Sequence, residues 1–232
     1  MPELSLNNIS IKRGNFSLEA NGIFKSGIHI VTGKIGSGKT TLSMILSGFL
    51  NPDSGTISTY GIEKKMLSMQ FPEYHLTKTK IESEIKSWDL SPLEILKTAE
   101  LQGRGNEDPM NLSRGELKRL HLACVLSKPF DLLLLDEPFS SLDVLWKKRF
   151  TKNLNYADKL IIIFTHEQAV LPKADYIWEI SKGKLNFIGK VPDSLDKWKN
   201  APEYLKFAHE KGASPENIRF EDTLEALCRM QE

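Results

Sequence analysis

The chain has 232 residues, of which 40% are hydrophobic and 26% are charged, with a formal net charge of +1 at pH 7. This composition excludes collagen-like, disordered and disulfide-rich chains, and the near-neutral charge offers no strong field for nucleic acid or an anionic membrane surface. The longest apolar runs, 132–135 and 160–164, fall far short of the ~18 residues of a membrane span, and no signal segment opens the chain, so we expect a cytoplasmic globular protein.

The first segment alternates apolar and polar residues on both sides of a turn. This pattern predicts a small antiparallel sheet with one face on the core and one face in water. The apolar positions are Leu4, Leu6, Ile9 and Ile11 before the turn at 13–15, and Phe16 and Leu18 after it.

A β-branched strand at 28–32 leads through a glycine-rich loop into a helix expected over 40–50. Residues 76–111 read as a polar helical stretch, and a further helix is expected over 114–126. The expected buried positions are Leu42, Ile45, Leu46 and Phe49 in the first helix, Leu93, Ile95 and Leu96 in the second stretch, and Leu117, Leu120 and Cys124 in the third helix.

Two short runs, 132–135 and 160–164, are apolar throughout and indicate strands buried on both faces, as in a parallel sheet covered by helices. A hairpin is expected from 176–180 and 185–188. In the tail, Pro202 can open a helix that ends at Gly212, and 214–215 can open the next. The apolar tail residues either pack on the domain's own core or form a dimerisation patch: Trp198, Tyr204, Leu205, Phe207, Leu224 and Leu227.

Residues 33–40, Gly-Lys-Ile-Gly-Ser-Gly-Lys-Thr, fit the pattern G-x-x-x-x-G-K-[ST] between a strand and a helix. Amides of such a loop and the dipole of the following helix converge on a polyphosphate. Lys39 adds a point charge for the outer phosphates, and the hydroxyl of Thr40 suits Mg²⁺. The alternative is a chance glycine turn, but the strand–loop–helix context favours nucleotide binding.

Asp136 and Glu137 follow directly after the buried strand at 132–135. Ligands of open parallel sheets collect at the carboxyl ends of the strands. Asp136 is therefore placed to hold Mg²⁺ through its water shell, and Glu137 to polarise an attacking water. The alternative is that both residues only begin a turn before Pro138.

The string at 112–116, Leu-Ser-Arg-Gly-Glu, resembles the LSGGQ signature of ATP-binding-cassette (ABC) ATPases. Gln70 resembles the Q-loop of that family, 141–143 the D-loop and His166 the switch histidine, in the same order. The resemblance covers about residues 4–190. It implies an ABC ATPase fold: an α/β P-loop NTPase core with a mostly parallel sheet, an antiparallel β subdomain and an inserted α-helical subdomain. The expected domains are 1–190, with the helical part at about 72–130, and a short helical C-terminal extension at 191–232.

The resemblance also implies a mechanism in which two protomers pair head to tail and sandwich two ATP molecules with Mg²⁺. Ser113 and the amide of Gly115 would reach the terminal phosphate on the other protomer, His166 would contact that phosphate, and Asp143 would organise the dimer seam. Gln70 would approach Mg²⁺ and the attacking water and report to a membrane partner. The implied catalytic residues are Glu137, His166 and Lys39; the implied metal ligands are Thr40, Gln70 and Asp136; the implied ATP-binding residues are Gly33, Lys34, Ile35, Gly36, Ser37, Gly38, Lys39, Thr40, Thr41, Arg13, Ser113, Gly115, Glu116 and Asp143.

The chain departs from the family pattern at three points. Arg114 replaces the first glycine of the signature, and Glu116 replaces its glutamine. The aromatic residue that usually stacks on adenine near the end of the first strand is missing. Either Arg13 stacks its guanidinium on the base, or Phe16 reaches it, or Arg13 is only a solvated turn residue.

Residues 70–73, Gln-Phe-Pro-Glu, resemble the Q-loop of energy-coupling-factor and cobalt-type importers. The expected function is therefore the ATPase subunit of an ABC importer, at the inner face of the cell membrane, bound to a transmembrane subunit and to a second ATPase that is identical or paralogous. The alternatives are a soluble ABC ATPase acting on nucleic acid or translation, an ATP-binding regulatory scaffold, and a P-loop small-molecule kinase.

Overall fold

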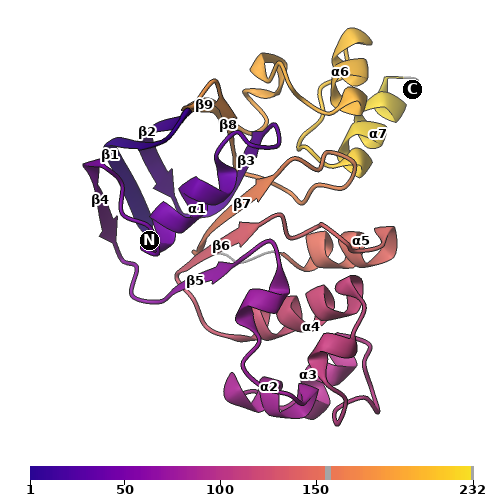
Figure 1. Cartoon of the computed structure of the whole chain (residues 1–232). Helices are drawn as coiled ribbons and strands as arrows, with labels where there is room; N and C mark the ends of the chain where they lie inside the picture. The colour runs from indigo at the N-terminus through magenta and orange to yellow at the C-terminus, as the bar shows by residue number, and fades with distance from the viewer. Residues whose placement is uncertain (155–157, 231–232) are drawn as a thin grey trace.

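A nine-stranded sheet runs through the part of the chain that the computed structural model describes, residues 1–154 and 158–230. The strand order is β4-β1-β2-β9-β8-β3-β7-β6-β5 (Figure 1). The strands are β1 (Glu3–Arg13), β2 (Phe16–Lys25), β3 (Gly27–Gly33), β4 (Ser54–Tyr60), β5 (Lys65–Ser68), β6 (Leu132–Asp136), β7 (Leu160–Thr165), β8 (Tyr176–Ser181) and β9 (Lys184–Lys190).

The sheet combines two kinds of pairing. β1 pairs antiparallel with β2 and β4, and β8 with β9, whereas β5, β6, β7, β3 and β8 run parallel to one another. β2 and β9 are joined at one position, Glu19 opposite Lys184. All residues of β6 and β7 are buried, because helices cover both faces of this part of the sheet. The α/β fold with a mostly parallel sheet is thus confirmed.

The helices lie in distinct places around the sheet (Figure 1). The helices labelled α2, α3 and α4 lie below the β5 edge, and those labelled α6 and α7 lie at the opposite end, near the C-terminus. The helices are α1 (Lys39–Ser47), α2 (Ile81–Ser87), α3 (Pro92–Thr98), α4 (Arg114–Ser127), α5 (Val144–Asn153), α6 (Glu203–Glu210) and α7 (Phe220–Arg229), with short 3₁₀ turns at η1 (Pro72–His75), η2 (Pro109–Asn111) and η3 (Leu195–Lys197).

The segment from α2 to α4 has an apolar cluster of its own, which includes Ile81, Ile85, Ile95, Leu117 and Leu120. This separate cluster supports the proposal that residues of about 72–130 form a helical subdomain. The division of the remaining chain into a 1–190 domain and a 191–232 extension also stays a proposal; residues 231–232 lie outside the described range.

Three expectations about helices are wrong. α1 ends at Ser47, because Gly48 adopts a left-handed φ of 88° and caps it, so Phe49 is 72% exposed rather than buried. The polar stretch at 76–111 contains two short helices and loops, and Leu93 is 80% exposed. The last helix starts at Phe220 and not at 214–215.

The structure tests one of the two roles expected for the tail, packing on the chain itself; a dimerisation patch stays a prediction. Trp198 and Leu205 are buried in the main core beneath the sheet, which confirms packing on the chain itself. Leu227 packs against a small alanine cluster between α6 and α7. Phe207 and Leu224 are about half exposed.

Candidate functional site

The glycine-rich loop joins β3 to α1 in a conformation that needs glycine. Gly36 and Gly38 have φ angles of 78° and 108°, in the left-handed region. At Gly33, a Cβ would lie 2.5 Å from the hydroxyl of Ser37 and 2.8 Å from the carbonyl of Ile180. The loop is therefore closely packed against β8 and leaves its own amides near the N-terminus of α1.

Lys39 lies at the base of this loop and is 6% exposed. Its Nζ donates to the carbonyls of Gly33 (2.9 Å) and Lys34 (3.2 Å) and lies 3.4 Å from Oε1 of Glu137. The ammonium is thus held by the loop and by a carboxylate, in the position where the sequence predicts the outer phosphates of a nucleotide.

Asp136, at the end of β6, is 1% exposed, and burial raises the pKa of its carboxyl against the opposing effect of a hydrogen bond from Thr40. Its Oδ1 atom is buried without a hydrogen-bond partner. An unpaired carboxylate oxygen beside a hydroxyl is the hard-oxygen donor set that Mg²⁺ accepts together with phosphate oxygens. Among the described residues, no group of three or more His, Cys, Asp and Glu could hold a metal.

Glu137 is buried and fixed by its neighbours. Its carboxylate accepts hydrogen bonds from the hydroxyl of Thr165 (3.1 Å), from the amide of His166 (3.1 and 3.2 Å) and from Nδ1 of His166 (2.7 Å). The Glu137 backbone has a positive φ of 47°, and its amide donates to the carbonyl of Phe164. The sequence predicted Glu137 and His166 but missed Thr165, which ends the apolar run of β7.

A cavity of about 310 Å³ joins the loop to these side chains. It is lined by the loop and α1 residues up to Thr41, and by Gln70, Glu137 and His166. A second cavity of about 780 Å³ lies on the other side of the loop and reaches Asn200 and Lys206 of the tail. The structure therefore brings the expected phosphate, metal and catalytic residues of one chain to one place.

Phe16 lines both cavities, and a Cβ at Gly38 would lie 2.8 Å from its ring. Arg13 lines neither cavity and forms an ion pair of 2.8 Å with Asp53. Of the two residues considered for adenine stacking, Phe16 alone is beside the phosphate loop.

The signature segment (residues 112–116) is not part of either cavity. Ser113 caps α4: its hydroxyl accepts from the amide of Glu116 (3.3 Å), and the Glu116 carboxylate accepts from the amide of Ser113 (2.8 Å). Arg114 is the first residue of α4 and is exposed. At Gly115, a Cβ would lie 2.7 Å from the carbonyl of Ser141, so this position needs glycine for packing.

Asp143 is likewise outside the cavities, and it caps α5 by accepting from the amide of Trp146 at 2.9 Å. The residues after it, Val144 and Leu145, are 59% and 70% exposed. Within one chain, then, Asp143 and the signature segment lie apart from the phosphate loop.

Lys118 on α4 was not identified from the sequence. It is 1% exposed, and its Nζ donates to the carbonyls of Gln70 (2.9 Å) and Met69 (3.3 Å). Burial lowers its pKa to about 8, opposed by the charges of Asp136 and Glu137. The sequence signal that could have identified it is a lysine beside the apolar stripe of the helix predicted over 114–126. Lys118 links α4 to the loop that carries Gln70.

Comparison with known proteins adds to this geometry. The ABC transporter family matches residues 19–140. The energy-coupling factor transporter ATP-binding protein EcfA1 of Thermotoga maritima is 32% identical, over 84% of this chain and 85% of its own. The sulfate/thiosulfate import ATP-binding protein CysA of Mesostigma viride is 34% identical, over 82% of this chain and 63% of its own.

Among solved structures, the dimeric ATP-binding cassette MJ0796 in a post-hydrolysis state, bound to ADP and Pi, superposes with a TM-score of 0.66. It is 20% identical in sequence and matches 80% of this chain and 96% of its own. This similarity shows the fold. Within residues 1–154 and 158–230, no helix is both long enough and apolar enough to cross a membrane.

Proposed function

The chain belongs to the ABC transporter family, and we propose that it is the ATPase subunit of an importer, working as one half of a head-to-tail dimer. One observation carries the proposal. Lys39, Glu137 and His166 line one cavity, and Asp136 is hydrogen-bonded to Thr40 in its wall, whereas the signature segment of the same chain lies outside it. A second ATPase subunit supplies the missing side.

The phosphate loop suits the triphosphate of ATP. The hydroxyl of Ser37 is buried without a hydrogen-bond partner and lines the larger cavity, whereas Lys39 lines the smaller one. Both would bind phosphate oxygens together with the amides of the loop. Phe16 beside the loop offers an apolar ring for the base. Thr40, Asp136 and Gln70 would hold Mg²⁺, which supplies positive charge to the outer phosphates.

Hydrolysis needs a base beside the terminal phosphate. Glu137 takes the proton of the attacking water while the water oxygen bonds to the terminal phosphorus and the bond to the bridging oxygen breaks, giving ADP and phosphate. Thr165 and the His166 amide fix both oxygens of the Glu137 carboxylate. Nδ1 of His166 is bonded to Glu137, and the ring is 46% exposed, so its Nε2 would contact the terminal phosphate.

The N-terminus of α4 would close the site from the other subunit. The hydroxyl of Ser113 accepts one hydrogen bond and keeps its own proton to donate. The amide of Gly115 is in the first turn of α4 and has no acceptor within the helix. Both can contact a phosphate bound by the opposing chain, so ATP stabilises the closed pair and its hydrolysis reopens it.

A transmembrane subunit would receive this motion near Gln70. Phe71 and Tyr74, which follow Gln70, are 46% and 72% exposed and form an edge-to-face pair. The similarity to EcfA1 and to CysA, whose names describe transport and import, favours an importer and, with residues 70–73, the energy-coupling-factor type. Residence at the inner face of the membrane follows from that partner.

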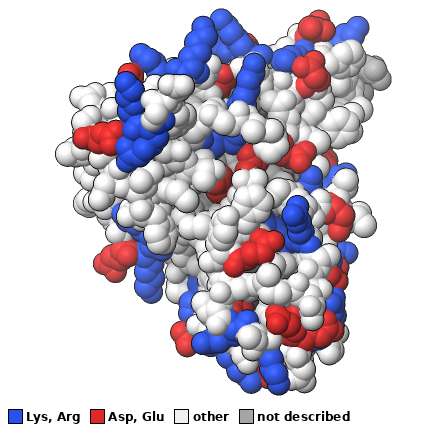
Figure 2. All heavy atoms as spheres, in the orientation of Figure 1, with Lys and Arg blue, Asp and Glu red and all other residues white. Residues whose placement is uncertain are grey.

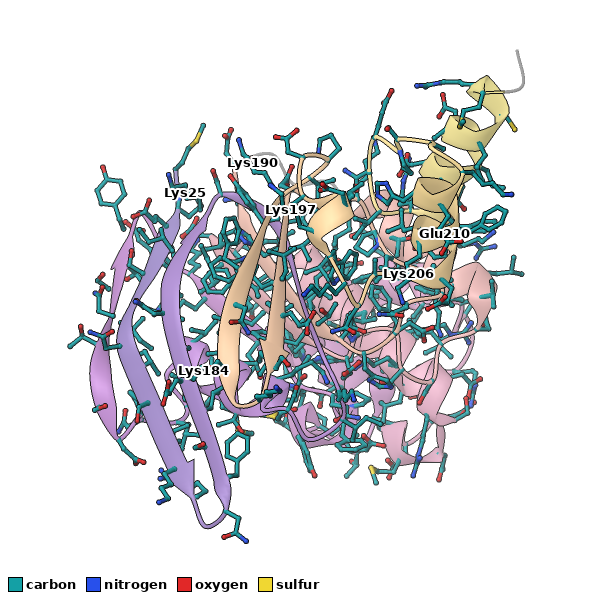
Figure 3. All side chains as sticks on the ribbon, turned by 90° about the horizontal axis from the view of Figure 1, so that it is seen from above. Lys25, Lys184, Lys190, Lys197, Lys206 and Glu210 are labelled. Carbon is teal, nitrogen blue, oxygen red and sulfur yellow. The ribbon has the colours of Figure 1, made fainter. Side chains whose placement is uncertain are left out.

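A soluble ATPase that acts on nucleic acid is the second candidate, and the surface does not favour it. On the face seen in Figure 2, basic side chains are frequent along the upper edge, where a few acidic ones lie among them, and over the rest of the face the two signs are mixed. From above, Lys25, Lys190 and Lys197 lie near one another, whereas Lys184 and Lys206 lie apart from them and from each other (Figure 3). A purely regulatory scaffold would not need Glu137 and His166 in hydrogen-bonding contact.

The proposed function is tested by expressing the tagged chain with the genes that adjoin its own and isolating it from solubilised membranes. We expect a multi-span membrane protein to co-purify, and ATP hydrolysis to fall steeply when the ATPase is diluted. Recovery without any membrane protein, together with a rate per chain that is unchanged by dilution, would overturn the proposal.

A further inference from the structure

Glu116 places a carboxylate in the signature segment, at the end of α4 that the proposed dimer turns toward a phosphate. A bare negative charge there would repel that phosphate. The carboxylate is nevertheless folded back: Oε2 accepts from the amide of Ser113 at 2.8 Å, and Oε1 lies 2.6 Å from Nη1 of Arg104.

Arg104 comes from the loop between α3 and η2 and binds two carboxylates. Besides Glu116, it contacts Glu107 through Nε (3.0 Å to each oxygen) and Nη2 (2.8 Å). The side chains are partly shielded, with 31% of Arg104, 27% of Glu116 and 42% of Glu107 exposed. Such bidentate contacts hold the guanidinium in one orientation.

The charges around Ser113 are balanced by this arrangement. Hydrogen bonds from Ser113, and then Arg104, lower the pKa of Glu116, so it is ionised at neutral pH. Arg114 is the exposed residue that follows Ser113, and it forms no ion pair within the described part of the chain. Arg104 therefore offsets the charges of Glu107 and Glu116 directly, and without Arg104 both carboxylates lose this cation.

We propose that Arg104 is a positioning residue that neutralises Glu116 and holds its carboxylate on α4, which leaves the Ser113 hydroxyl and the Gly115 amide open to the phosphate of the opposing chain. This role rests on the proposed head-to-tail dimer. It explains how a glutamate is tolerated where the family has glutamine, because the charge that the substitution adds is cancelled by an arginine from a neighbouring loop.

The competing explanation is that Arg104 only staples its loop to α4. The two explanations differ in what Glu116→Gln does, since glutamine keeps a hydrogen-bond acceptor for Arg104 but carries no charge. If Arg104 only holds its loop against α4, Arg104→Met has the same effect with glutamate or glutamine at position 116. A neutralising arginine matters only when position 116 is charged.

The experiment is a double-mutant cycle of Arg104→Met and Glu116→Gln, made in a Glu137→Gln chain so that ATP is bound but not hydrolysed. The readout is the ATP concentration that half-saturates dimer formation, measured by light scattering on the chain with whichever ATPase subunit co-purifies. Arg104→Lys tests rescue by charge alone. Arg219→Met is the matched control, because Arg219 makes a two-point contact with Asp222 at the start of α7, outside the signature segment.

We expect Arg104→Met to raise the half-saturating ATP concentration about tenfold when Glu116 is present and less than twofold with Glu116→Gln, the difference shrinking at high salt. Arg104→Lys should restore most of the loss, and the effect of Arg219→Met should not depend on position 116. Equal effects of Arg104→Met in both backgrounds would overturn the inference while leaving the dimer intact. Absence of any ATP-driven dimer would instead overturn the proposed function, and this inference with it.

Discussion

Nδ1 of His166 lies 2.7 Å from Oε1 of Glu137, although the two residues directly follow different strands, β7 and β6. The parallel register places Asp136 opposite Phe164, so the residues that follow both strands meet at the same edge of the sheet. The sheet itself therefore positions the proposed base, Glu137, and the histidine that contacts it.

Glu137→Gln should keep ATP binding and slow turnover by about 10²- to 10⁴-fold, because the amide cannot take a proton from water. The variant should accumulate an ATP-bound dimer, which size-exclusion chromatography with light scattering detects. Turnover like that of the unchanged chain would remove Glu137 as the base.

Lys39→Ala should weaken ATP binding about 10- to 100-fold, because a charge-assisted contact to phosphate is lost. Calorimetry measures the affinity. Lys34→Ala is the matched control on the same loop, since Lys34 is exposed and not fixed at the loop base; its effect should be smaller. Unchanged affinity in Lys39→Ala would contradict the assignment of the phosphate loop.

Phe16→Ala should lower the affinity for ATP about tenfold and leave that for inorganic tripolyphosphate nearly unchanged, because ring–base stacking contributes only to the nucleotide. Competition with a fluorescent ATP analogue measures both. If Arg13 were the stacking residue, Arg13→Ala would show this selective loss and Phe16→Ala would not.

Gly115→Ala should destabilise the chain by about 1 kcal/mol, even though alanine favours helix more than glycine does. The added Cβ would meet the Ser141 carbonyl, a backbone atom that cannot turn aside, and overpacking of this kind costs about 1–3 kcal/mol. Urea unfolding measures the change. A more stable variant would show that the residues around Ser141 yield easily.

Acid should destabilise the fold through His29. Burial lowers the pKa of His29 from 6.5 to about 4, so the folded chain keeps the ring neutral while the unfolded chain binds a proton below 6.5. Stability is therefore lost as the pH falls from 6.5 toward 4, by the order of 2 kcal/mol between pH 7 and pH 5. Thermal unfolding at several pH values measures this.

His29→Phe provides the comparison for that measurement. It removes the hydrogen bond from Trp178 and lowers stability at every pH, but the dependence on pH should become shallower. His75 and His121, whose pKa values are also lowered by burial, would account for the remainder. An unchanged pH dependence in His29→Phe would exclude His29 as a source.

The sequence was sufficient for the elements that depend on local pattern. The fully apolar runs became β6 and β7, and the glycine-rich loop lies between β3 and α1. The sequence was insufficient where a single residue ends a helix although the helical spacing of apolar residues continues. Gly48 ends α1 in this way, one residue before Phe49. The prediction that Leu93 is buried was wrong, because the short surface helix α3 buries only one side, which carries Ile95.

Within the candidate site, motif spacing located side chains but not their partners. Nothing near Arg13 in the sequence indicates Asp53, which folds back from the end of α1 to pair with it. Likewise, Arg104 meets Glu116 through a loop whose path no periodicity describes. Pairings between loops depend on the tertiary fold, so they could be seen only in the structure.

Lys118 donates hydrogen bonds to main-chain carbonyls of the loop that carries Gln70, and not to the side-chain amide of Gln70. These hydrogen bonds do not depend on the side chain at position 70. A substitution of Gln70 therefore leaves the hydrogen bonds between this loop and α4 in place, and a loss of ATP hydrolysis in such a variant can be ascribed to the lost amide group.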